Sequence, residues 1–261
     1  MRSVPFKRSW VLANPQQLAT EVHVWCANLD FPAAQLWRLA RTLSADEQRR
    51  AERFYFERDR RRFIASHGVL RTILASYLDT SPAHLQFSVG RHGKPALRDA
   101  YPGPPLCFNM SHSHNTALYA ITSNRAIGVD IEHCHPLPDM AQLAQRFFFP
   151  SEYAALCSLA PALQTAYFFA VWTCKEAYLK ATGEGLTGLE QVEIELLLDS
   201  PAAPVCRCKS AGQTGCWSLQ TWQPRPGYQA ALAVDGEDWE LVQIPDGSVR
   251  LNDEDLEILN W

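Results

Sequence analysis

Hydrophobic and polar residues alternate along this chain with two different periods. Residues 21–27 and 126–132 alternate at every second position, which predicts strands with one buried face. Residues 62–78 and 167–183 repeat apolar side chains at every third or fourth position, which predicts two long amphipathic helices. Each strand therefore precedes a helical region in its own part of the chain.

The second set of patterns follows the first at a nearly constant offset of 105 residues. Residues 43–54 and 85–89 fit residues 148–159 and 190–194 at the same offset, and residues 116–123 resemble 229–236 after a change of offset. We therefore predict an α+β fold made of a pseudo-twofold pair of similar α+β halves. The predicted halves are residues 1–124 and 125–261, with a polar extension of the second half from about Glu237.

Charge divides along the same boundary. The chain of 261 residues is 47% hydrophobic, as in ordinary globular proteins, but residues 1–125 have a formal charge of +8 and residues 126–261 one of −12. A basic half suits a polyanionic ligand and an acidic half suits a metal ion, although solvated helix faces are the simpler explanation of most charge runs. The sequence contains neither a signal-peptide pattern nor an apolar segment of membrane-spanning length, so we expect a cytoplasmic monomer without membrane or nucleic-acid partners.

Two carboxylates interrupt the apolar strand in the sequence GVDIEH, residues 128–133. Asp130 and Glu132 are two positions apart, so they share one face of the predicted strand, while Val129 and Ile131 face the other way. Like charges this close repel, and their desolvation is costly, so a cation is expected between them. With Glu176 as a third oxygen ligand, the cation that fits best is Mg²⁺.

Glu176 lies in a second motif, VWTCKEAYLKATGEGL, at residues 171–186. Glu176 and Lys180 are four positions apart on a predicted helix and so share a face, with Lys175 at its edge. Such a pair is usually solvent-exposed and contributes little to stability. The many aromatic and aliphatic neighbours in this helix favour a functional role instead.

Basic and hydroxyl side chains elsewhere could bind phosphate. Ser111 and His112 follow one another in a Ser-His-Ser-His turn, where capping or solvent contact is the alternative. Lys94 lies between a glycine and a proline on a predicted rigid turn. Arg62 belongs to a basic segment with an apolar stripe, and we expect it to point inward.

Taken in order, these motifs resemble those of the 4′-phosphopantetheinyl transferases, specifically the long, surfactin-synthetase-activating type. The resemblance covers about residues 40–235 and rests on the R-F-x-x-x-x-D-x-x-R segment, G-K-P, F-N-x-S-H, G-V-D-I-E and the W-T-C-K-E-A-Y-L-K-A-T-G-E-G-L run. It implies transfer of the phosphopantetheine arm of coenzyme A to a serine of an apo acyl or peptidyl carrier protein, with release of adenosine 3′,5′-bisphosphate. The implied carriers serve fatty acid, polyketide or nonribosomal peptide synthesis.

The resemblance also implies roles for individual residues. It implies Mg²⁺ ligands at Asp130, Glu132 and Glu176, pyrophosphate contacts at Lys175 and Lys180, adenosine and phosphate contacts at Lys94, Ser111 and His112, and basic contacts at Arg50 and Arg62. Glu176 and Lys180 are the expected catalytic pair, with Glu176 or a metal-bound water as the base. The chain departs from some members at Glu47, where they have a lysine.

Two alternative functions and one structural question remain open from the sequence. The same acids and basic half would suit a Mg²⁺-dependent nucleotide pyrophosphatase, although its usual Glu-rich helix is missing. A module that binds coenzyme A or carrier proteins without catalysis is the second alternative. The run of three phenylalanines at residues 147–149 either belongs to the core or lines a groove for the carrier's helix.

Overall fold

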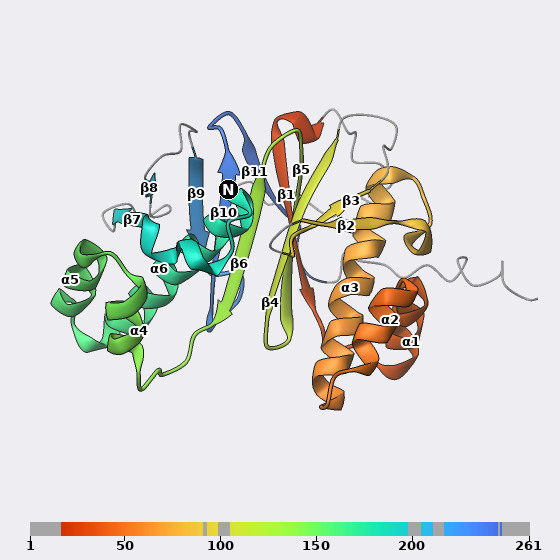
Figure 1. Cartoon of the computed structure of the whole chain (residues 1–261), viewed down its shortest axis with the longest axis horizontal. Coiled ribbons are helices and arrows are strands. Elements are labelled where there is room, and N and C mark those ends of the chain that lie inside the picture. The colour runs from red at the N-terminus through yellow and green to blue at the C-terminus, as the bar shows by residue number, and fades with distance from the viewer. Residues whose placement is uncertain are drawn as a thin grey trace, which may run out of the picture.

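Two β-sheets lie between two groups of helices (Figure 1). The computed structural model describes residues 17–90, 93–98, 105–197, 205–210, 217–244 and 246. Helices α1 to α3 cover the outer face of one sheet, and α4 to α6 cover the outer face of the other (Figure 1). None of the described helices is long and apolar enough to cross a membrane.

The first half supplies one helical layer and most of one sheet. Its elements are β1 (Glu21–Asn28), α1 (Ala33–Thr42), α2 (Ala45–Glu52), α3 (Glu57–Leu78), β2 (Phe87–Val89), β3 (Pro95–Leu97), β4 (Leu106–Ser113) and β5 (Thr116–Ser123). The sheet has the order β11-β1-β5-β4, and β2 and β3 form a separate hairpin. β1 runs antiparallel to β5 with Trp25 opposite Tyr119.

The second half repeats this order of eight elements. They are β6 (Ile127–His133), α4 (Met140–Phe147), α5 (Pro150–Ser158), α6 (Pro161–Thr182), β7 (Val192–Leu197), β8 (Val205–Ser210), β9 (Trp217–Trp222) and β10 (Tyr228–Asp235). Its sheet has the order β6-β10-β9-β8-β7, so β6 and β10 pair as β1 and β5 do. The predicted pair of similar α+β halves is confirmed.

The last described strand, β11 (Glu240–Ile244), departs from the sequence-based expectation. It runs parallel to β1, with Glu21 opposite Glu240, and so completes the sheet of the first half instead of extending the second. Asp246 continues this contact because its carboxylate accepts a hydrogen bond from the Asn28 amide at 3.0 Å. Without β11, the edge of β1 would expose unpaired backbone groups.

Alternation along the strands builds three hydrophobic clusters rather than two. On β6, Ile127, Val129 and Ile131 pack with residues of β1, β5 and β10 in a cluster between the two sheets. The opposite face of β6 is directed toward α6. Helices and outer sheet faces form the other two clusters, one in each half. The shared middle cluster holds the halves together, and β4 and β6 meet beside it (Figure 1).

Candidate active site between the two halves

Side chains rather than a backbone ladder join β4 to β6. Asn109 accepts a hydrogen bond from the amide of Val129 at 2.8 Å, and the Ser113 hydroxyl accepts one from the amide of His133 at 3.1 Å. Neither Asn109 nor Ser113 was among the predicted site residues, although Asn109 belongs to the F-N-x-S-H motif. Their signal was the two-residue spacing from Ser111, which places all three side chains on one face of β4.

Gly128 allows α6 to lie directly on β6. A Cβ atom at this position would stand 2.0 Å from the carbonyl oxygen of Ala177 and 2.5 Å from the amide nitrogen of Ala181. Any larger residue would therefore push the helix away from the strand. The close approach brings one face of α6, with Glu176 and Lys180, over the carboxylate of Asp130.

Three side chains form the centre of the site. Lys180 donates hydrogen bonds to Asp130 Oδ1 at 2.6 Å and to the Ser111 hydroxyl at 2.9 Å. Ser111 in turn donates to the same Asp130 oxygen at 2.8 Å. Asp130 is only 3% exposed, and its second oxygen, Oδ2, has no hydrogen-bond partner. An unpaired buried carboxylate oxygen needs a cation or donor to offset its desolvation.

Two further carboxylates surround this centre. Burial, followed by the charge of Asp130, raises the pKa of Glu176 to about 7, and the same causes raise the pKa of Glu132. Ser113 donates a hydrogen bond to Glu132 at 2.9 Å, whereas Glu176 has no hydrogen bond or ion pair within the described chain. The charge of Asp130 acts on both glutamates, so the three carboxylates lie near one another.

The chemistry of this donor set fits a small divalent cation. Hard carboxylate oxygens suit Mg²⁺, which keeps several water ligands and needs few from the protein. Asp130 Oδ2 is unpaired, and Glu176 feels the charge of Asp130. Among the described residues no three acidic, histidine or cysteine side chains have metal-site spacing, and Lys180 forms an ion pair with Asp130.

Basic side chains of the first half face the same centre. Burial and then the charges of Lys180 and Arg62 lower the pKa of His112, so His112 lies near both cations. Arg62 Nε is buried and has no hydrogen-bond partner, which leaves a donor available to an anion. Arg50 stands over the ring of Phe63 at 5.2 Å and lies near His67.

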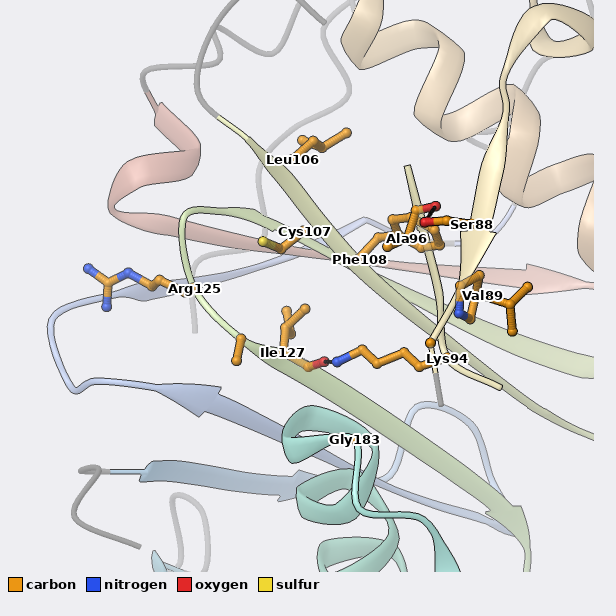
Figure 2. Close-up of a pocket in the computed structure, with 13 residues that line it drawn as sticks. Ser88, Val89, Lys94, Ala96, Leu106, Cys107, Phe108, Arg125, Ile127 and Gly183 are labelled. Carbon is orange, nitrogen blue, oxygen red and sulfur yellow. Dashed lines mark hydrogen bonds between the residues drawn. The ribbon is translucent and has the colours of Figure 1, made fainter. Parts of the chain in front are cut away.

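A cavity of about 380 Å³ lies at the beginning of β4 and β6, the opposite end of these strands from Ser113 and His133. Its lining is mainly apolar and includes Phe108, Ile127 and the β2–β3 hairpin (Figure 2). Lys94 crosses the cavity and donates to the carbonyl oxygens of Ile127 at 2.9 Å and Ala181 at 3.1 Å. Phe108 precedes Ser111 by three residues, about 10 Å along a strand.

Lys175 is not brought to this centre. It is completely buried, forms an ion pair with Glu152 at 2.8 Å and donates to the carbonyl oxygens of Phe147, Leu189 and Val192. These partners satisfy the ammonium group within the core of the second half. The position of Lys175 therefore does not support the expected contact with pyrophosphate.

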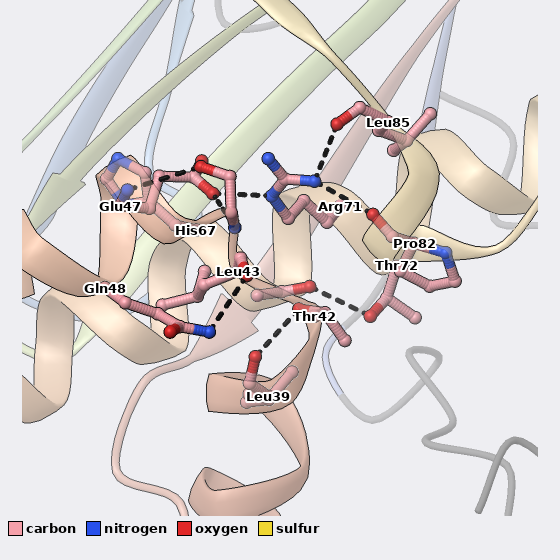
Figure 3. A network of polar contacts seen from close by, with 12 residues as sticks. Leu39, Thr42, Leu43, Glu47, Gln48, His67, Arg71, Thr72, Pro82 and Leu85 are labelled. Atoms are coloured by element: carbon pink, nitrogen blue, oxygen red, sulfur yellow. Dashed lines mark hydrogen bonds and ion pairs between the residues drawn. The ribbon is translucent and has the colours of Figure 1, made fainter. Parts of the chain in front are cut away.

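Glu47 likewise has a structural environment. Its carboxylate accepts from the Ser44 amide at 2.8 Å, which closes the capping box of α2, and from Arg71 Nε at 2.7 Å (Figure 3). Arg71 also donates to the carbonyl oxygens of Pro82 and Leu85. The carboxylate of Glu47 is thus part of a buried ion pair with Arg71.

Of the three phenylalanines at residues 147–149, Phe148 is buried in the core and Phe147 and Phe149 are half-buried. Phe148 is 7% exposed and stacks on Phe168, and Phe147 packs edge-to-face on Trp172. Lys175 lies over the rings of Phe148 and Phe149. These contacts favour a place in the core for this run over a groove that binds the helix of a carrier protein.

Comparison with known proteins agrees with this architecture. Residues 126–233 match the family described as the 4′-phosphopantetheinyl transferase superfamily, and residues 31–124 match the 4′-phosphopantetheinyl transferase N-terminal family. The chain is 46% identical to 4′-phosphopantetheinyl transferase HetI of Nostoc sp., over 85% of this chain and 91% of that protein. It belongs to the 4′-phosphopantetheinyl transferase family.

More distant relatives support the long type of transferase. 4′-Phosphopantetheinyl transferase Sfp of Bacillus subtilis is 28% identical over 76% of this chain and 84% of its own length. The L-aminoadipate-semialdehyde dehydrogenase-phosphopantetheinyl transferase of Schizosaccharomyces pombe is 32% identical over 68% of this chain and 76% of its own length. In this transferase the two matched family regions meet at the boundary between the two halves.

Proposed function

We propose that this transferase moves the 4′-phosphopantetheine arm of coenzyme A to a serine hydroxyl of an apo carrier protein. Adenosine 3′,5′-bisphosphate is the leaving group, and the carriers are acyl or peptidyl carriers of fatty acid, polyketide or nonribosomal peptide synthesis. The observation that carries the proposal is the junction of Asp130, Lys180 and Ser111, with an unpaired carboxylate oxygen beside it. The proposed location is the cytoplasm. The proposed oligomeric state is a monomer, because both halves of the site come from one chain.

The metal proposed for this site is Mg²⁺, held by Asp130, Glu132 and Glu176. When bound, it supplies positive charge to the pyrophosphate and to the oxygen that leaves. Ser111 and Lys180 now share Asp130 Oδ1, so Oδ2 and the two glutamates are the oxygens available to the metal. The raised pKa values of Glu132 and Glu176 are the property that a divalent cation would reverse.

Lys180 and Glu176 are the proposed catalytic side chains. Lys180 Nζ, with Ser111, is placed to donate to a phosphate oxygen and to stabilise the charge that develops as the pyrophosphate bond breaks. Glu176 is proposed to take the proton of the attacking serine, because it shares a face of α6 with Lys180. In the proposed reaction a P–O bond to the carrier serine forms as the P–O bond to the bisphosphate breaks.

The nucleotide is proposed to lie along β4. His112, Arg62 and Arg50 offer positive charge or donors to its phosphates, and the cavity beside Lys94 offers an apolar place for the adenosine. Lys94 acts here by joining β6 and α6 next to the cavity, through its two carbonyl contacts. Glu47 and Lys175 have no part in the proposed binding of the nucleotide.

One experiment separates this proposal from its alternatives. The protein is incubated with coenzyme A, Mg²⁺ and a purified apo acyl carrier protein, and the intact carrier mass and the free nucleotide are both measured. A gain of one phosphopantetheine by the carrier, with release of the bisphosphate, supports transfer. Released nucleotide without carrier modification would indicate a pyrophosphatase, and an unchanged mixture would leave only binding.

A further inference from the structure

Three consecutive aromatic residues form an exposed ridge between α2 and α3. Tyr55 is 91% exposed, Phe56 61% and Phe54 41%. Only three other large hydrophobic residues of the described chain are exposed to a similar degree, and they are separated in sequence: Trp37, Val89 and Leu163. A run of exposed aromatic side chains is unfavourable in water unless another surface covers it.

The ridge is anchored to the basic part of the candidate site. Phe54 packs on Phe63 with ring centroids 5.3 Å apart, and the guanidinium of Arg50 lies over the ring of Phe63, 5.2 Å from its centroid. Phe63 stacks in turn on His67 at 3.9 Å. Tyr55 and Phe56 contact each other edge-to-face but extend away from this support. The base of the ridge is therefore rigid, and its outer two rings remain available.

Positive charge surrounds the aromatic rings. Residues 49–62 contain seven arginines and three acidic residues. Some of the arginines are engaged locally, as in the pair of Arg60 with Glu57, but Arg53 is exposed and has no side-chain partner in the described part of the chain. The ridge thus combines apolar rings with a net positive rim, which complements an acidic partner with an apolar stripe.

The ridge opens toward the same end of the molecule as the carboxylates. Figure 1 places the first turns of α3 at the end where the β4–β5 hairpin turns. Burial and then the charges of His133 and Arg62 lower the pKa of His114 in that hairpin, with a further contribution from Arg58. A partner on the ridge would therefore lie on the side of the molecule at which the β4–β5 hairpin turns, where β4 with Ser111 and Ser113 ends.

We infer that the Phe54–Phe56 ridge docks the acidic, helical surface that borders the accepting serine of the carrier protein. This inference rests on the proposed function and names the surface that recognises its protein substrate. Tyr55 and Phe56 cover the apolar stripe of the carrier helix, and Arg53 faces its acidic side chains. The ridge takes the role that the sequence suggested for residues 147–149, of which Phe148 is buried and none is among the exposed large hydrophobic residues.

The test compares two acceptors and two surfaces. Tyr55 and Phe56 are replaced together by serine, Arg53→Glu is made separately, and Trp37→Ser serves as the matched control because it removes an exposed aromatic ring that also lies beside an arginine. Each variant is assayed with an apo acyl carrier protein and with a short serine peptide. Binding of the apo carrier without coenzyme A is measured by titration calorimetry.

We expect the double variant to raise the KM for the carrier about tenfold, as for loss of an interface hot spot. The KM for coenzyme A, the rate with the peptide and the Trp37→Ser variant should stay unchanged. An unchanged carrier KM, or an equal effect of Trp37→Ser, would overturn the inference. If the wild-type protein binds the carrier without modifying it, the proposed function fails, and the effect of the ridge variants on carrier binding then tests the docking inference. If the wild-type protein does not bind the carrier, both the proposed function and the docking inference are overturned.

Discussion

Each half buries an ion pair between its long helix and the short helix before it. In the first half, Glu47 at the third position of α2 accepts hydrogen bonds from a backbone amide and from Arg71 on α3. In the second half, Glu152 at the third position of α5 accepts from the Phe149 amide and from Lys175 on α6. Each cation also donates to carbonyl oxygens of the segment that follows its helix. The repeat therefore includes an ion pair as well as an order of elements.

The halves differ at four positions that face the long helices. Where the first half has Trp25 and Ala27, the second has Asp130 and Glu132. The two ion pairs make Arg71 of α3 equivalent to Lys175 of α6, so the offset between the long helices is 104 residues rather than 105. At this offset, Thr72 is equivalent to Glu176, and Ser76 is equivalent to Lys180. Thr72 and Ser76 bond carbonyls of their own helix. One scaffold thus supports either packing or chemistry, depending on a few side chains.

The largest effect on transfer activity is expected from removing a central carboxylate that the fold does not need for its stability. Asp130→Ala should lower kcat/KM for transfer by about 10³-fold, because the metal and Lys180 lose their shared partner. Unfolding by urea in the absence of metal should show unchanged or higher stability, since repulsion among the carboxylates is relieved. Glu132→Gln should be milder, because an amide oxygen can replace a Mg²⁺ ligand. An unfolded Asp130→Ala protein would make the carboxylate structural.

The second prediction concerns the buried ion pair that the two halves share. Lys175→Met should destabilise the protein by about 3–5 kcal/mol, because it leaves Glu152 buried without its cation. Arg71→Met is the matched variant of the first half and should cost a similar amount. Urea unfolding measures both, and the folded fraction of each should retain its KM for coenzyme A. A stable Lys175→Met protein that had lost catalysis would instead support a pyrophosphate contact for Lys175.

The third prediction concerns pH and the carboxylates of the second half. The folded-state pKa of Glu176, about 7, lies above the ordinary value of 4.5, so its contribution to stability is present below pH 4.5 and is lost as pH rises through 7. Without metal, unfolding free energy should fall over this window by up to about 3 kcal/mol. Glu176→Gln should flatten that part of the profile, and Mg²⁺ should restore stability above pH 7. A wild-type profile equal to that of Glu176→Gln would contradict the shift.

The smallest expected effect tests the basic half. Arg62→Ala should raise the KM for coenzyme A about five- to tenfold, through loss of one charged hydrogen bond. If Arg62 holds the 3′-phosphate, the defect should disappear with dephospho-coenzyme A. Lys94→Ala is the comparison, because Lys94 contacts two backbone carbonyls and should weaken both substrates alike. Equal defects of Arg62→Ala with the two substrates would remove Arg62 from that role.

The sequence alone was sufficient for the plan of the fold and for the central acids. Hydrophobic periodicity and the repeat predicted two α+β halves, because each period reflects which face of an element is buried. The two-residue spacing of Asp130 and Glu132 set them on one face of β6, and the structure places Val129 and Ile131 in the cluster on the other face. The four-residue spacing likewise set Glu176 and Lys180 on one face of α6.

Only the tertiary structure decided which lysine of α6 enters the core and which one reaches the candidate site. Lys175 and Glu176 are adjacent in sequence, but one step along a helix rotates a side chain by about 100°, so one enters the core and the other faces Asp130. Packing against α5 and β7 selects the first direction, and Gly128 admits the second. The parallel pairing of β11 with β1 has the same origin, because a partner for an edge strand is chosen by position in space and leaves no period in the sequence.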